Sequence, residues 1–189
     1  MTQTAPDRFT RTPLTDETID AILTVYVDAR AELQHLEHYQ PPRMRAQLKR
    51  HATRPGCLAA LAWREDEPVG YAYGCPLGAE NTWWPRVYPP PSADIVREDG
   101  QRTFRLDEIA VLTSRRGTGT ARTVHDHLLD GWTGRATLMV NPLAGDGKVQ
   151  AVYERWGYVP VGHAQPQDTA PVLTVMIRPS LSAVAGKAG

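Results

Sequence analysis

The spacing of apolar residues predicts a long helix near the start of the chain. Over residues 13–39, apolar side chains recur every three or four positions, which is typical of a helix with one buried face: Ile19, Ile22, Tyr26, Ala29 and Leu33. Thr15 is placed to cap this helix, and acidic residues follow it in the first turn. A second, shorter helix is predicted over residues 41–52, where a proline stands at the first position.

Strand-like runs follow these helices. Residues 57–63 and 68–77 are mostly apolar, and the polar tetrapeptide "REDE" between them predicts a hairpin turn. The first twelve residues are polar and contain proline, so they form either a loose segment or an edge strand. Further on, we expect strands at 104–112 and 135–140, and two final strands at 158–162 and 172–177.

Two more helices are predicted between the later strands, at residues 121–132 and 148–156, the second of which Gly157 would end. The resulting order is a mixed α/β chain, with too few strand–helix alternations for a doubly wound sheet. We therefore expect one domain over residues 13–179, with flexible segments at 1–12 and 180–189.

Residues 79–103 interrupt this pattern. The segment "AENTWWPRVYPPPSADIVREDGQRT" joins two strands but is far longer than a hairpin connection. Its prolines favour a stiff surface flap, whereas its aromatic residues favour a loop that lines a substrate site. The sequence leaves both readings open.

Composition narrows the class of protein. Of 189 residues, 41% are hydrophobic, and 21 basic residues balance 21 acidic ones. The neutral balance argues against a general nucleic-acid binder. No apolar run reaches the roughly 18 residues that a membrane span needs, and the N-terminus lacks an apolar signal core. Cys57 and Cys75 fit no metal motif and predict no disulfide framework, so we expect a cytoplasmic protein.

The stretch "RRGTGTA", residues 115–121, lies between a predicted strand and a predicted helix. The start of a helix leaves N–H groups without partners and carries partial positive charge, so it favours anions such as phosphate. Glycines allow the backbone to approach the anion, and the arginines add charge. No lysine follows Gly119, which excludes a P-loop, and Arg122 stands where a dinucleotide fingerprint needs glycine.

The remaining pattern, Arg116-x-x-Gly119-x-Ala121, resembles the pyrophosphate loop of the GNAT superfamily of N-acetyltransferases. "LDEIAVLTSRRGTGTARTVHDHLL" is similar to the central strand, loop and helix of that family, and "MVNPLAGDGKVQAVYERWGYVPVG" to its next segment. "PVGYAYG" resembles the strand before the central one. The resemblance covers residues 15–178 and is strongest over 104–162.

This resemblance implies an α+β fold: a twisted, mostly antiparallel sheet flanked by helices, in which two adjacent parallel strands splay apart. Acetyl-CoA would lie between the strands at 104–112 and 135–140. Its pantetheine arm would pair with the backbone of residues 109–113, and its pyrophosphate would bind the glycine loop. The cofactor residues so implied are Ile109, Ala110, Val111, Thr113, Arg115, Arg116, Gly117, Thr118, Gly119, Thr120, Ala121 and Asn141. No metal is implied.

The implied chemistry is acetyl transfer to an amine, which must lose a proton before it attacks. Asp107 or Glu108 would act as the base. Because strand side chains alternate, the two should face opposite ways; Glu108 is slightly preferred. Tyr153 would protonate the leaving thiolate, and a strand amide such as that of Val111 would stabilise the oxyanion. The family often has an asparagine shortly before this tyrosine; Asn141 and Asp146 both remain open for that position.

The acceptor side should be formed by the N-terminal helices and by residues 79–103, with Tyr39, Trp83, Trp84 and Tyr88 as candidate contacts. A small-molecule amine is the first choice of acceptor, and a protein amine the second. A sensor that binds acyl-CoA without catalysis and a regulator that binds nucleotides are the alternatives. No nucleic-acid or membrane partner is expected, and a homodimer is possible.

Overall fold

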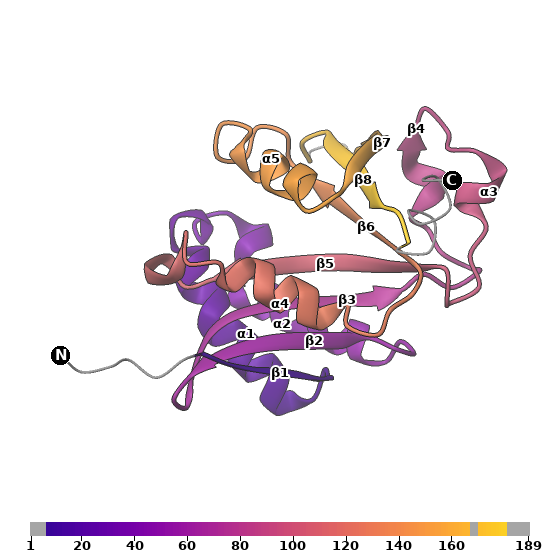
Figure 1. Cartoon of the computed structure of the whole chain (residues 1–189). Coiled ribbons are helices and arrows are strands. Elements are labelled where there is room, and N and C mark those ends of the chain that lie inside the picture. The colour runs from indigo at the N-terminus through magenta and orange to yellow at the C-terminus, as the bar shows by residue number, and fades with distance from the viewer. Residues whose placement is uncertain (1–6, 167–169, 181–189) are drawn as a thin grey trace. The chain divides into compact units, whose positions relative to one another are not determined.

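The computed structural model describes residues 7–166 and 170–180. Packing divides the chain into two compact units. The first combines residues up to Cys75 with Asp107–Asp130, and the second combines Pro76–Leu106 with the chain from Gly131 onward. Strand β5, Thr103–Val111, runs from the second unit into the first (Figure 1).

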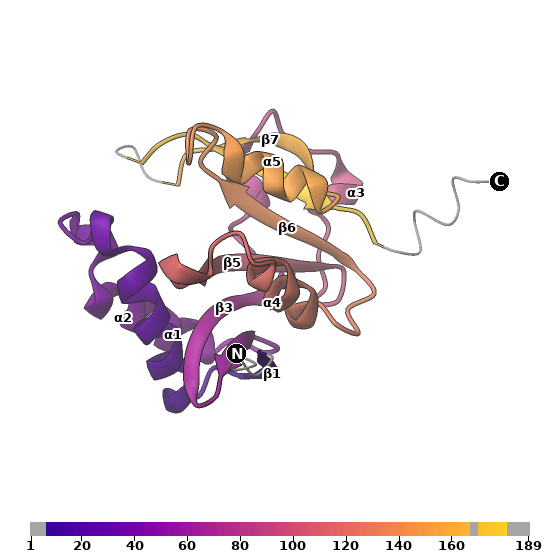
Figure 2. The ribbon, with the colours of Figure 1, turned by 60° about the vertical axis from the view of Figure 1, so that its left-hand side comes forward.

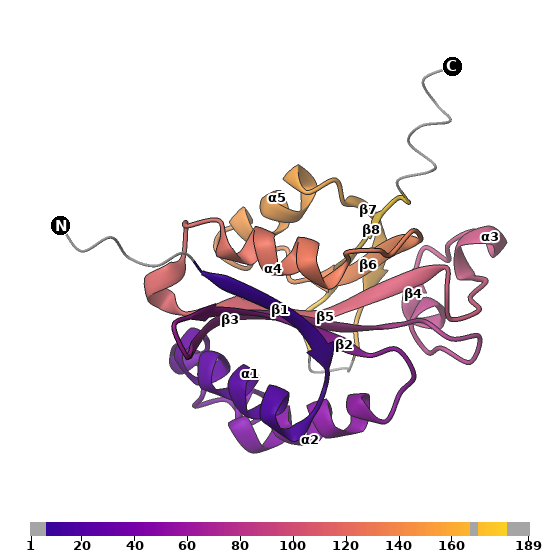
Figure 3. The same ribbon diagram turned by 60° about the horizontal axis from the view of Figure 1, so that its bottom comes forward.

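In the first unit an antiparallel meander lies between helices. The strands β1 (Arg8–Pro13), β2 (Leu58–Arg64) and β3 (Glu67–Pro76) are followed in the sheet by β5. Figure 3 shows α1 (Asp16–Ala29) and α2 (Pro41–Ala52) on one face of these strands and α4 (Thr120–Leu128) on the other. Residues 8–13, which the sequence left open, therefore form the edge strand.

Helix α1 begins as predicted but ends earlier. The Thr18 amide donates to Thr15 Oγ1 at 3.2 Å, which caps the helix. The helix ends at Ala29 and does not continue to residue 39; two short 3₁₀ helices, η1 (Ala31–Leu33) and η2 (Glu37–Tyr39), follow. Neither 3₁₀ helix has a fully buried residue, and only the partly buried Tyr39 at the end of this stretch packs against the core. The stretch therefore lacks the continuous buried face that stabilises a long helix.

The hairpin between β2 and β3 is confirmed, but the expectation for the cysteines is wrong. Leu58 pairs with Gly74, and the turn closes at Arg64 and Glu67. Cys57 and Cys75 form a disulfide. Because they flank the Leu58–Gly74 pair, the antiparallel register brings them opposite each other, although they are 18 positions apart in sequence.

The second unit holds the parallel pair and the C-terminal strands. Here the order is β5, β6 (Arg135–Val140), β8 (Leu173–Arg178), β7 (Val159–Ala164) and β4 (Val87–Tyr88). β5 and β6 are parallel, and the other pairs in this unit are antiparallel. Figure 2 shows α5 (Lys148–Arg155) beside β6 and β7. The predicted mixed, mostly antiparallel sheet flanked by helices is confirmed.

Helix ends differ slightly from prediction. α5 ends at Arg155 with Gly157 two positions later at φ +88°, as expected of a helix that closes on glycine. α4 ends at Leu128, not at residue 132, and Gly131 follows with φ +71°. The predicted flexible segment 1–12 is wrong for residues 8–12, which lie in strand β1. Residues 1–6 and 181–189 of the two predicted flexible segments lie outside the described residues. Among the helices described, none has the length and apolar character needed to cross a membrane.

Candidate functional site

The glycine loop joins β5 to α4 in the first unit. A 3₁₀ turn, η4 (Thr113–Arg115), precedes it, and Gly119 stands at the N-cap of α4 with φ +88°. This left-handed conformation favours glycine. A Cβ added at Gly119 would meet nothing within 4 Å, so the space beside the loop backbone is open. No side chain caps α4.

Backbone amides of the loop fall into two groups. The amides of Arg116 and Thr118 donate to the carbonyls of Thr113 and Arg115, at 3.3 and 3.4 Å. Four other amides make no hydrogen bond within the described part of the chain: those of Gly117, Gly119, Thr120 and Ala121. All four belong to the cofactor residues that the resemblance implies. Donors without partners at a helix N-terminus are suited to an anion.

Glu108 lies on β5, before the loop, and is largely buried. Arg30, which follows α1, donates to Glu108 Oε1 through Nε at 3.3 Å and Nη2 at 3.1 Å. Burial raises the pKa of Glu108 above its usual value, although the charge and hydrogen bonds of Arg30 oppose this. Burial, together with the charge of Glu108, also raises the pKa of Tyr26 to about 12. Glu108 is thus a largely buried carboxylate with an arginine as its fixed partner.

Asp107 has a different partner from the same helical layer. Its Oδ2 lies 3.8 Å from Nδ1 of His51, which is near the end of α2. Strict alternation would turn Asp107 and Glu108 to opposite faces of the strand. Their partners are Arg30, directly after α1, and His51, on α2, and these two helices contact each other. The two carboxylates are therefore distinguished by their partners, an arginine for Glu108 and a histidine for Asp107.

The two arginines of the loop also differ. Arg115 forms an ion pair with Asp7, which also binds Arg64 at 3.0 Å. Arg116 is exposed and donates only to the Ala29 carbonyl, at 3.3 Å, within the described residues. Arg115 thus ties the loop to the start of β1. Of the two predicted cationic contacts, Arg116 is the one whose charge has no acidic partner in the described part of the chain.

We expect Asp7→Asn to lower stability at neutral pH by about 1.5–3 kcal/mol, since Asp7 binds two charged partners. Burial raises the pKa of Asp7, but Arg64 and Arg115 outweigh it and hold the pKa below the usual value. This stabilisation is present above the unfolded pKa of about 3.9 and is lost as pH falls through the folded pKa. Denaturant unfolding at several pH values measures it, with the exposed Asp16→Asn as control.

In the second unit, Tyr153 projects from α5 into an aromatic cluster. Its ring lies edge-on to Trp156 and Tyr158, with centroids 5.4 and 5.8 Å away, and it is 9% exposed. Asn141, after β6, accepts the Leu143 amide at 3.0 Å and so shapes the following turn. Asp146 lies in the same turn with φ +56°. Nothing in these contacts favours Asn141 over Asp146 as a ligand-binding residue.

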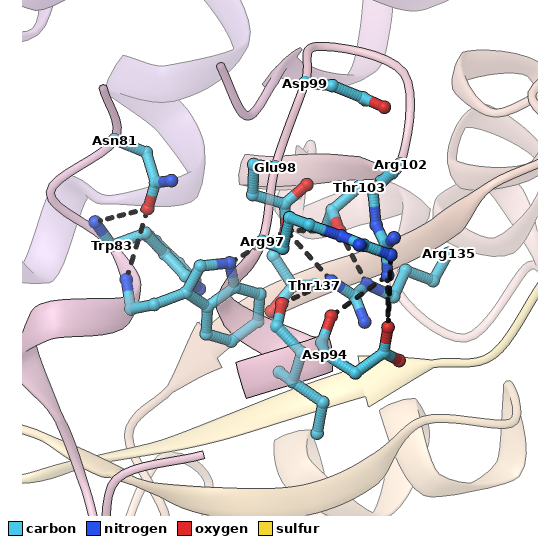
Figure 4. A network of polar contacts seen from close by, with 12 residues as sticks. Asn81, Trp83, Asp94, Arg97, Glu98, Asp99, Arg102, Thr103, Arg135 and Thr137 are labelled. Atoms are coloured by element: carbon cyan, nitrogen blue, oxygen red, sulfur yellow. Dashed lines mark hydrogen bonds and ion pairs between the residues drawn. The ribbon is translucent and has the colours of Figure 1, made fainter. Parts of the chain in front are cut away.

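Residues 79–103 are ordered by a buried polar network (Figure 4). Trp84, 2% exposed, donates from Nε1 to Glu98 Oε1 at 2.8 Å, and the same oxygen accepts from Thr103 and Arg135. Trp84, a candidate substrate contact in the sequence, is buried in the core of this unit. Its neighbour Trp83 is half-buried and holds the guanidinium of Arg105 over its ring.

The other predicted acceptor contacts have separate surroundings. Tyr88 is 74% exposed at the short strand β4. Tyr39, in the first unit, is half-buried, and its carbonyl accepts from the Tyr26 hydroxyl at 3.1 Å. Tyr39 belongs to the first unit, whereas Trp83 and Tyr88 belong to the second. Their grouping as acceptor contacts stays a prediction.

Comparison with solved structures identifies the fold. An acetyltransferase of the GNAT family from Streptococcus agalactiae has a TM-score of 0.66 at 18% identity, with 91% of this chain and 95% of that chain covered. The protein has the GNAT fold. An acetyltransferase from Thermus thermophilus gives 0.62 at 19% identity, covering 90% and 96%. The PaiA N-acetyltransferase from Thermoplasma acidophilum, solved with coenzyme A, gives 0.56 at 10% identity, covering 91% and 99%.

The sequence matches no protein-family model and no curated protein. The expected resemblance to GNAT proteins is therefore borne out at the level of the fold, through structure and not through sequence similarity.

The GNAT fold implies coenzyme A, and the loop residues fit it. The loop presents four amides without partners, open space over Gly119, and the exposed Arg116. In addition, the ladder between β5 and β6 covers only Thr103–Arg105. Beyond Arg105, β5 therefore pairs only with β3 among the described strands, and its other edge has no strand partner there. A strand edge of this kind suits the amides of a pantetheine arm.

Sequence reasoning missed four residues of this site in the GNAT fold: Asp7, Arg30, His51 and Tyr71. Each reaches a predicted site residue from a distant part of the chain; Arg30 and Glu108, for example, are 78 positions apart. Tyr71 is fully buried on β3, and its hydroxyl acts to lower the pKa of Glu108. No periodicity or motif marks these pairings.

Proposed function

We propose that the protein transfers an acetyl group from acetyl-CoA to the amine of a small molecule. The observation that carries this proposal is the set of four amides without partners in the loop that directly follows β5 and its two carboxylates. The GNAT fold supports acetyl transfer as the reaction class, and the loop supports a phosphate-bearing donor.

Binding of the donor follows from the loop. Amides of Gly117, Gly119, Thr120 and Ala121 would donate to the pyrophosphate, and the guanidinium of Arg116 would add charge. The backbone of Ile109–Val111 would hydrogen-bond the pantetheine amides. The Thr113 amide already donates to Asp28 Oδ2 at 2.6 Å, so this predicted contact is the least accessible of the set.

The thioester supplies an activated acetyl carbonyl when acetyl-CoA is bound. Glu108 would accept the proton of the attacking amine, and Arg30 would hold its carboxylate in one orientation. The amide of Val111 would donate to the carbonyl oxygen as negative charge develops on it. Tyr153 is the candidate acid that donates a proton to the departing sulfur.

Two measurements in order test the proposal. Calorimetric titration with acetyl-CoA should show binding, and release of free thiol should then follow with at least one amine of a broad panel. Tyr153→Phe should slow release without weakening acetyl-CoA binding. Binding without turnover of any amine would favour a non-catalytic acyl-CoA sensor, and no binding at all would remove the proposal.

We expect Gly119→Ala to weaken coenzyme A binding by about tenfold or more. The alanine would be strained at φ +88°, and its methyl group would enter the open space where the anion would lie. Tenfold corresponds to about 1.4 kcal/mol, less than several hydrogen bonds to a charged group contribute. Calorimetry of coenzyme A binding measures the change.

Gly100→Ala is the matched control. Gly100 also has φ +88° and also has open space beside it, but it lies in the second unit and outside the loop. Gly100→Ala should lower the free energy of unfolding about as much as Gly119→Ala does, and it should leave the dissociation constant for coenzyme A unchanged. Equal affinity of Gly119→Ala and the parent protein would contradict the assignment of the loop.

A further inference from the structure

Four potential metal ligands converge in the first unit, apart from the glycine loop. Cys57 precedes β2, Cys75 lies on β3, His51 is on α2, and Asp107 is on β5. One ligand atom each from His51, Cys75 and Asp107 lies within 4.8 Å of the others. The disulfide bond places the Cys57 sulfur directly beside that of Cys75.

All four side chains are shielded from solvent. The exposed fractions are 7% for His51, 6% for Cys57 and 2% for Cys75, and the Asp107 side chain is 11% exposed. Each comes from a different segment of the fold, so the packing of α2 against β3, β5 and the residue before β2 fixes the cluster. Exposed clusters of acidic groups are common in proteins that bind no metal ion. This cluster differs from them because it is buried and combines an imidazole, a carboxylate and two sulfurs.

We propose that reduction of the Cys57–Cys75 disulfide creates a zinc site formed by Cys57, Cys75, His51 and Asp107. Two thiolates, one imidazole and one carboxylate are the donor types that zinc binds in tetrahedral sites. With metal–ligand distances of about 2.0–2.3 Å, tetrahedral ligand atoms lie roughly 3.3–3.8 Å apart. The separation of 3.8 Å between His51 Nδ1 and Asp107 Oδ2 already falls at that spacing.

The redox step is balanced by a dithiol reductant. The dithiol gives up two electrons and becomes a disulfide, while the Cys57–Cys75 bond breaks and each sulfur takes a proton. The freed sulfurs then separate to contact distance, close to the spacing that zinc requires. Zinc binding releases the thiol protons, since the ligands are thiolates. In the oxidised protein the sulfurs are bonded to each other and cannot act as thiolates.

Zinc binding would therefore report the redox state of the disulfide and fix the Asp107 carboxylate. The inference does not depend on acetyl transfer, because it rests on four side chains that the proposed cofactor loop does not include. Failure of one proposal thus leaves the other unaffected.

The test compares the full chain in its oxidised form and after reduction with dithiothreitol, which is removed anaerobically before metal is added. Elemental analysis after dialysis against zinc should give a single zinc ion per reduced chain and none per oxidised chain. Cobalt(II) added to the reduced chain should give thiolate-to-metal charge transfer and the intense visible bands of four-coordinate cobalt.

Variants assign the ligands. Asp107→Asn and His51→Gln should each weaken zinc binding by at least about 10–100-fold, the loss that even supporting residues of zinc sites cause. His163→Gln, at an exposed histidine on β7, should bind like the parent, and circular dichroism checks that each variant folds. Reduced protein without zinc, six-coordinate cobalt spectra, or undiminished affinity in Asp107→Asn would each overturn the proposal.

Discussion

Replacing Glu108 with glutamine is expected to lower kcat/KM for acetyl transfer by roughly 10²–10⁴-fold, the usual contribution of a general base. Glutamine keeps the size of the side chain and an oxygen for Arg30 but cannot take a proton from the amine. Thiol release with the best amine found in the panel measures the effect. Affinity for acetyl-CoA should change little, because Glu108 is not among the loop donors.

Asp107→Asn serves as the matched comparison. Asp107 directly precedes Glu108 in the chain and carries the same functional group, but its partner is His51 and not Arg30. We expect a loss of less than about tenfold, since the loss of a proton acceptor has a large effect only where the acceptor reaches the amine. A large loss in Asp107→Asn with little change in Glu108→Gln would assign the base to Asp107.

The largest expected effect on stability comes from Glu98→Ala. Glu98 is fully shielded as a side chain, and Arg135, 14% exposed, pairs with it at 3.1 Å (Figure 4). Removing one partner of a buried ion pair leaves an uncompensated charge and costs about 3–5 kcal/mol. The Trp84 and Thr103 donors also lose their acceptor. Denaturant unfolding followed by tryptophan fluorescence measures the change.

Asp94→Ala provides the control for this ion pair. Asp94 also contacts two arginines in the same segment, Arg97 at 3.6 Å and Arg102 at 3.2 Å, but its side chain is 74% exposed. Exposed pairs contribute about 0–1 kcal/mol, so its loss should be small. Similar losses in Glu98→Ala and Asp94→Ala would show that the buried network does not order residues 79–103.

The sequence could predict a role for Glu108 but not for Glu98. Asp107 and Glu108 are visible as candidates because they precede a glycine loop in a recognisable strand–loop–helix order. Glu98 has no such context, since it lies in a segment rich in proline and polar residues. Its role depends on Arg135, 37 positions away, which no local pattern associates with it.

The sequence by itself determined the local structure. The spacing of apolar residues, the Thr15 cap, the "REDE" turn and Gly157 all act through neighbours a few positions away, so the helices and strands they predict are present. The glycine loop is local too: the left-handed conformation of Gly119 and the first turn of α4 follow from seven consecutive residues.

Only the tertiary structure decided which distant side chains meet. The Cys57–Cys75 disulfide, the Arg30–Glu108 and Asp7–Arg115 ion pairs, and the burial of Trp84 each depend on strand register or helix packing. α1 likewise ends at Ala29, and the 3₁₀ helix that follows it, Ala31–Leu33, has no buried residue. Such contacts arise when segments far apart in the chain pack together, and a pattern of neighbouring residues carries no record of them.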